Sequence, residues 1–108
     1  MDTYFAKYIL AIFRTAPMVV FSWGFHSPTA IENGLAFQVN GYKHQGRVEV
    51  VYDEGWDLFI AKTFNQDGTI KEEKEGIYID QLVDAIDGMV EKTEDYKERV
   101  RQTYGMYD

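Results

Sequence analysis

Residues 47–64 read RVEVVYDEGWDLFIAKTF, a pattern typical of two antiparallel strands joined by a tight turn. Over residues 47–52 an apolar side chain stands at every second position, and Asp53, Glu54 and Gly55 are residue types that favour a turn. Residues 56–64 carry apolar groups on both faces of the second strand. We therefore expect that strand to lie in the middle of a sheet.

The flanking stretches extend this pattern to both sides. Further strands are predicted over residues 18–25, 35–43 and 69–79. Turns are expected at residues 32–34, 44–46 and 65–68, because Asn, Asp and Gly tolerate positive φ, and a loop is expected at Ser27 and Pro28. The sequence thus predicts an antiparallel meander of four or five strands.

Two amphipathic helices are predicted around these strands. The first spans about residues 3–15 and ends before Pro17, with Phe5, Ile9, Ile12 and Phe13 on one face. The second begins with Asp80 as N-cap and continues to residue 91 with one apolar stripe. A short further helix is expected over residues 93–104, where Tyr96, Val100 and Tyr104 are spaced four apart.

The resulting fold class is α+β, with residues 1–108 forming a single domain. The C-terminal helix is expected to pack on one face of the sheet. The other face then carries more apolar area than one helix covers, so we expect the N-terminal helix to lie there, with self-association as the alternative.

The composition narrows the classes of function. The chain has no cysteine and only two histidines, His26 and His44, which leaves no disulfide, thiol nucleophile or thiolate metal ligand and favours a cytoplasmic protein. Lys7 and Arg14 interrupt the apolar N-terminal stretch, so neither a signal peptide nor a membrane span is expected.

Catalytic patterns are also missing. Ser27 beside His26 lacks the sequence of a nucleophile elbow, and the glycines do not follow a phosphate-loop spacing. An EF-hand loop through Asn65 and Asp67 fails, because its twelfth position would be Lys74 instead of Glu. We expect no enzymatic activity, no cofactor and no metal.

The charge is concentrated in one part of the chain. Of a net charge of −7, residues 67–108 contribute twelve acids and six bases, or about six of the surplus negative charges. The polar face of the second predicted helix holds the candidate partner-binding residues Asp80, Asp84, Asp87 and Glu91. These side chains are either solvated surface charge or a face that binds a basic protein, for example by resembling DNA phosphates.

One segment carries a family resemblance. FNQDG at residues 64–68, Lys71, and KEGI at residues 74–77 followed by a helix make residues 47–91 similar to the positive-cofactor-four family of single-stranded-DNA-binding transcriptional coactivators. The resemblance implies that Phe64 stacks on a base, that Lys62, Lys71 and Lys74 contact phosphates, and that the helix dimerises. Three glutamates, Glu72, Glu73 and Glu75, interrupt the basic ridge of that family.

A second likeness is one of style. GLAF at residues 34–37, GWDLF at 55–59 and YIDQL at 78–82 are similar to segments of small proteins encoded by bacterial phages and mobile elements, a likeness that brings no activity or site residue. The expected function is a non-enzymatic protein-interaction module, with a protein partner or a second copy as binding partner. The alternative is a coactivator-like module that binds single-stranded DNA.

Overall fold

The computed structural model describes residues 3–92. Within them, five strands form one antiparallel sheet in chain order: β1 (His26–Ile31), β2 (Gly34–Asn40), β3 (Gln45–Asp53), β4 (Leu58–Phe64) and β5 (Ile70–Ile77). The helices are α1 (Tyr4–Phe13), α2 (Pro17–Ser22) and α3 (Leu82–Val90), and the 3-10 turn η1 (Ile79–Gln81) leads into α3. The predicted α+β meander with a helix before and after it is confirmed. The helix expected over residues 93–104 lies outside the described residues.

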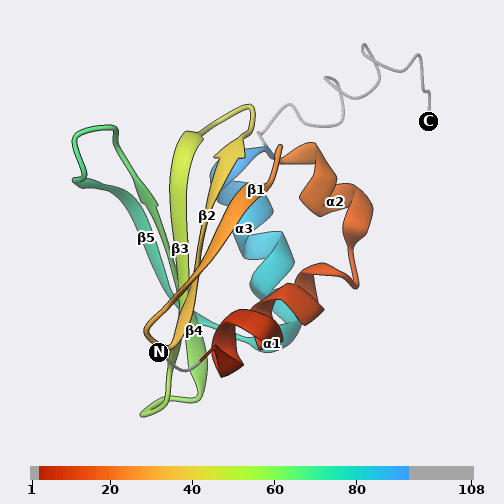
Figure 1. Ribbon diagram of the computed structural model, residues 1–108, viewed down its shortest axis with the longest axis vertical. Helices are drawn as coiled ribbons and strands as arrows, with labels where there is room; N and C mark the ends of the chain where they lie inside the picture. Colours follow the sequence, from red (N-terminus) through yellow and green to blue (C-terminus); the bar gives the residue numbers. More distant parts are fainter. Residues whose placement is uncertain (1–2, 93–108) are drawn as a thin grey trace.

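All three helices lie on the same side of the sheet (Figure 1). The α1 helix packs on β1, β2 and β3, and α3 packs on β4 and β5. The expectation that the N-terminal helix covers the opposite face is therefore wrong. Five strands spaced about 4.8 Å apart are wider than one helix of about 10 Å, so two helices side by side are needed to cover one face.

Strand register sorts the side chains onto two faces. Leu35 pairs with Val50, which pairs with Ala61, and these buried residues face the helices. The residues that alternate with these buried ones along β3 and β4 lie on the other face, called here the open face. They are Arg47, Glu49, Val51, Ile60, Lys62 and Phe64. No helix of residues 3–92 covers the open face (Figure 1).

The largest departure from the predicted elements is at residues 18–25. These residues were expected to form a strand, but residues 17–22 form helix α2, and the strand follows at His26–Ile31. Pro17 occupies the first turn of α2, where its fixed φ suits a helix and its missing N–H costs nothing. The expected loop at Ser27 and Pro28 is instead part of β1, an edge strand that tolerates proline and contains a register shift.

Smaller corrections concern the ends of elements. Gln45 already belongs to β3, so the turn between β2 and β3 falls earlier than residues 44–46. Trp56 precedes β4 and is exposed. Asp80 lies within η1, and the N-cap of α3 is Gln81. Such shifts arise because capping and pairing depend on contacts that a local pattern does not contain.

Aromatic rings fill the space between helices and sheet. Phe13 of α1 makes edge contacts with the rings of Trp23, Phe25 and Phe37, at centroid distances of 5.5 to 5.8 Å. Phe5 stacks on Tyr52 at 4.7 Å, which places Tyr52 on the helix-covered face. These rings form the aromatic part of the core between the helices and the sheet.

Candidate interaction surface

Packing divides the four acids predicted on the polar face of α3. Asp87 is only 7% exposed, and its Oδ1 accepts a hydrogen bond of 3.0 Å from the indole N–H of the fully buried Trp23. An indole has a donor and no acceptor, so a buried tryptophan needs such a partner. The prediction of Asp87 as a partner-binding residue is replaced by a structural role, because α2 brings Trp23 onto this side of α3.

Glu91 also has a partner within the chain. Its Oε2 accepts the backbone N–H of Tyr42 at 2.8 Å, and the backbone N–H of Lys43 donates to the Val90 carbonyl at 2.8 Å. The turn between β2 and β3 thus closes the C-terminus of α3, where carbonyl groups lack helical partners. Glu91 belongs to this closure.

Asp80 and Asp84 are the two acids that remain exposed. Asp84 lies 3.8 Å from the ammonium of Lys92, and both side chains are well exposed, so this ion pair contributes little to stability. These two carboxylates are therefore the members of the predicted set that a partner can reach.

Beside them lies a hollow of about 310 Å³ between the α1–α2 turn and α3. Its apolar lining comes from Ile12, Ala16, Val19, Ile79 and Val83. Thr15 and the three aspartates Asp80, Asp84 and Asp87 complete the part of the lining that residues 3–92 provide, and no lysine or arginine of this range belongs to it. We call this feature the α2–α3 hollow.

The α2 helix contributes an unusual exposed surface next to the hollow. None of its six residues is buried, and Met18 and Phe21 are 79% and 81% exposed. Val19, also exposed, reaches the hollow itself. Large apolar side chains that are exposed together often mark an interaction surface, because their contact with water is unfavourable.

The residues implied by the coactivator resemblance do not share one surface. Lys62 and Phe64 lie on the open face, where Lys62 is paired between Glu49 and Glu73. Lys74 pairs with the buried Ala61 and lines a small hollow with Asp84, which places it on the helix-covered side. Lys71 is held by the carbonyl of Lys43 at 3.0 Å.

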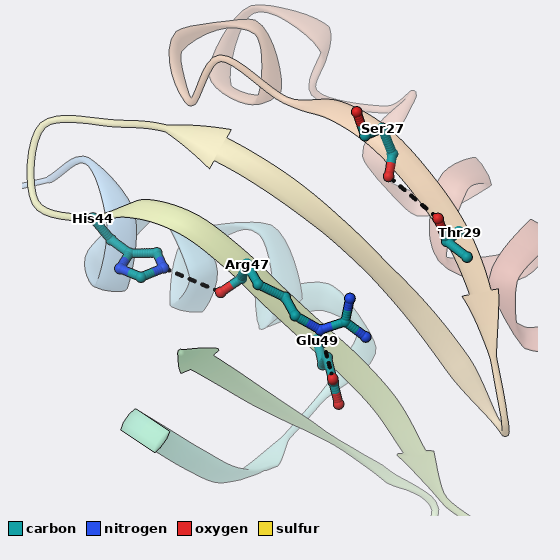
Figure 2. A network of polar contacts seen from close by, with 5 residues as sticks. All are labelled: Ser27, Thr29, His44, Arg47 and Glu49. Atoms are coloured by element: carbon teal, nitrogen blue, oxygen red, sulfur yellow. Dashed lines mark hydrogen bonds and ion pairs between the residues drawn. The ribbon is translucent and has the colours of Figure 1, made fainter. Parts of the chain in front are cut away.

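The open face carries polar groups of both signs. Arg47 Nε lies 2.8 Å from Glu49 Oε2 along β3 (Figure 2). A hollow of about 600 Å³ opens between these residues and the β4–β5 turn, and its lining includes Phe64, Asn65 and Gln66. Acids adjacent to each base make this face a poor match for a continuous phosphate backbone.

His44 is buried, although its sequence context suggested a turn residue. Its Nε2 lies 3.1 Å from the Arg47 carbonyl (Figure 2), and its Nδ1 lies 3.4 Å from the Lys71 ammonium. Burial lowers the pKa of His44 below its usual 6.5. The contacts suit a neutral ring that donates from Nε2 and accepts at Nδ1. On the exposed edge strand, His26 Nδ1 lies 3.1 Å from Ser27 Oγ.

Neither a metal centre nor a membrane span emerges from residues 3–92. No group of three or more histidine and carboxylate side chains in this range is arranged to hold a metal ion. No helix in the same range has the length and apolar character needed to cross a membrane. No family model, curated protein or solved structure matches the chain.

Proposed function

We propose that this protein is a non-enzymatic protein-interaction module that binds its partner through α2 and the adjoining flank of α3. The observation that carries the proposal is the exposure of Met18 and Phe21 on a helix with no buried residue. Burying a side chain of this size contributes about 1.5–3 kcal/mol, so two of them supply a substantial anchor for a partner.

The surroundings of α2 support the same surface. Asp80 and Asp84 lie close by in an accessible position, and the α2–α3 hollow provides a concave site beside the helix. An apolar centre with a polar rim is the usual anatomy of a protein interface. The two acids are thus retained from the predicted partner-binding set, in a new setting.

Site-specific photo-crosslinking tests the proposal. A benzophenone side chain at position 18 or 21 should form an adduct with one protein species in cells of the source organism, and unlabelled protein should compete for it. The same group at Gln66, an exposed residue of the β4–β5 turn, is the matched control. The purified partner should then bind wild-type protein and lose affinity for Phe21→Asp. Equal adducts at all three positions, or none, would reject the proposal.

The single-stranded-DNA alternative has one structural point in its favour. Phe64 and Lys62 share the open face with Arg47. Glu49 and Glu73 flank Lys62 across the neighbouring strands, and Lys71 and Lys74 lie elsewhere. This arrangement supports nucleic-acid binding less than the α2 surface supports protein binding.

A cytoplasmic location and a phage or mobile-element origin remain predictions from the sequence. The first rests on the absence of cysteine, and the second on the style of three short segments. A homodimer is a further prediction, and light scattering on the purified protein tests it.

A further inference from the structure

We infer that the partner segment bound beside α2 is a basic amphipathic helix of another protein, an inference that rests on the interaction function proposed above. It concerns the α2–α3 hollow, where an apolar lining and three aspartates occur together.

The geometry of the hollow favours a helix as occupant. The lining takes Ile79 and Asp80 from η1 and Val83, Asp84 and Asp87 from α3. These positions recur about every four residues, so the lining runs along η1 and the first part of α3. The elements around it are helices and the 3-10 turn η1. In the α1–α2 turn, the backbone N–H groups of Thr15 and Ala16 donate to carbonyls of α1. None of the strands β1 to β5 contributes a residue to the lining, so the part of the chain that the structure describes offers no strand edge there for an extended segment. A helix satisfies its own backbone and needs only apolar side chains to fit.

The charge of the hollow selects a basic occupant. Asp80 and Asp84 are exposed and four residues apart, which matches lysine or arginine side chains spaced by one turn on a facing helix. Among residues 3–92 no lysine or arginine belongs to the lining, and the nearby Lys92, 3.8 Å from Asp84, has a well-exposed side chain. An apolar stripe on the partner would meet Val19 and Val83, while flanking bases reach the two carboxylates. Opposite charges speed association and exclude acidic competitors.

The same charge argues against a second copy in this hollow. A two-fold symmetric contact brings the same patch of both copies together. The aspartates of one copy would then face those of the other, and each copy carries a net charge of −7. Like charges in that position are unfavourable, whereas a basic helix neutralises them.

Fluorescence anisotropy with three peptides and the full-length protein tests the inference. The first probe is a labelled peptide of about 18 residues with leucine along one helical face and lysine on both flanks. The second replaces lysine by glutamate, and the third scrambles the first so that the helical periodicity is lost. We expect micromolar binding of the first, at least about ten-fold weaker binding of the scrambled peptide, and no binding of the acidic one.

Variants of exposed residues locate the binding. Val19→Lys should lower the affinity for the basic peptide by about ten-fold or more, because it places a cation in the hollow. The double variant Asp80→Lys, Asp84→Lys should no longer bind the basic peptide and should bind the acidic peptide instead. Glu73→Lys makes the same type of charge change on the open face and should leave affinity nearly unchanged. Circular dichroism of each variant checks that it is folded.

Several outcomes would overturn the inference. Equal affinity for the scrambled peptide means unspecific attraction between charges. If a peptide with the sequence of residues 93–108 binds more tightly than the basic peptide, the hollow is assigned to the chain's own C-terminal segment. A dimer in light scattering that Val19→Lys dissociates assigns it to a second copy. If all peptides fail while crosslinking at position 21 still identifies a partner, the basic-helix inference is rejected and the interaction function stands.

Discussion

Trp23 illustrates how one residue determines the role of another far along the chain. Its indole N–H bonds to Asp87, 64 positions later, and this turns an apparent surface acid into part of the core. His44 is a similar case beside the β2–β3 turn, because a residue predicted only as part of a turn is buried and hydrogen-bonded.

The buried contact between Trp23 and Asp87 predicts a stability difference. Asp87→Ala leaves the indole donor without a partner and should lower the free energy of unfolding by about 1–3 kcal/mol. Asp87→Asn keeps an acceptor oxygen and should lower it less. Urea denaturation followed by fluorescence measures both, with the exposed Asp84→Ala as control. If Asp84→Ala costs as much as Asp87→Ala, the contact has no special weight.

His44 predicts a dependence of stability on pH. Burial lowers its pKa, opposed by the bond to the Arg47 carbonyl and aided by the Lys71 charge, with Glu72 acting weakly in the other direction. The unfolded chain takes up the proton first as the pH falls below 6.5. The stability from the neutral ring is therefore complete above 6.5 and lost as the pH falls toward the lowered folded pKa.

Unfolding free energies measured between about pH 7.5 and 5 check this expectation, since that range brackets the unperturbed histidine pKa. His44→Gln should give a flatter profile than wild type in that window. His26→Gln changes an exposed histidine and should retain the wild-type slope. Identical profiles for wild type and His44→Gln would show that His44 does not carry the effect.

At the level of elements, the turn between β2 and β3 and the end of α3 form one unit. Lys43 donates its backbone N–H to Val90 and its ammonium to the Gly88 carbonyl, and Tyr42 donates to Glu91. Gly41 allows this approach, because a Cβ there would collide with the Val90 carbonyl. The sheet and α3 are thus joined by backbone contacts as well as by the core.

Two glycine substitutions with opposite expected signs test this unit. Gly41→Ala should destabilise the protein by more than about 1 kcal/mol, since the obstructing atom belongs to the backbone and cannot move alone. Gly88→Ala lies within α3 with open space around its Cβ and should stabilise by about 0.5–1 kcal/mol. Thermal or urea unfolding measures both. A neutral Gly41→Ala would mean that the turn and helix end are not tightly coupled.

At the level of the whole molecule, the helices lie on one side of the sheet and the open face on the other (Figure 1). The exposed apolar residues of α2 and the accessible acids belong to the helical side, whereas the open face mixes acids and bases. This separation of surfaces underlies the preference for a protein partner over nucleic acid.

Binding of labelled single-stranded oligonucleotides tests that preference directly. We expect no submicromolar affinity at low salt, because the net charge is −7 and the bases of the open face, Arg47 and Lys62, have glutamates beside them. Anisotropy at low and moderate salt measures this. Tight binding that weakens steeply with salt and is lost in Lys62→Ala and Phe64→Ala would instead support the coactivator-like function.

Local patterns were sufficient for much of the architecture. The alternation in residues 47–64, the turn residues around it and the apolar stripes of α1 and α3 each act over a few positions, so the meander and its two main helices could be predicted. The acid-rich C-terminal part was also visible, and Asp80 and Asp84 prove accessible as expected of surface charge.

What only the tertiary structure decided depends on contacts between distant residues. A short apolar run such as residues 18–22 suits a strand or a helix, and its packing beside α3 gives α2. The side chosen by α1, the burial of Asp87 and the capping role of Glu91 likewise follow from contacts across the fold. The sequence by itself thus determined the meander, the helices α1 and α3 and the overall charge. Tertiary packing decided which apolar and acidic groups remain exposed together, because exposure depends on which neighbours cover a side chain.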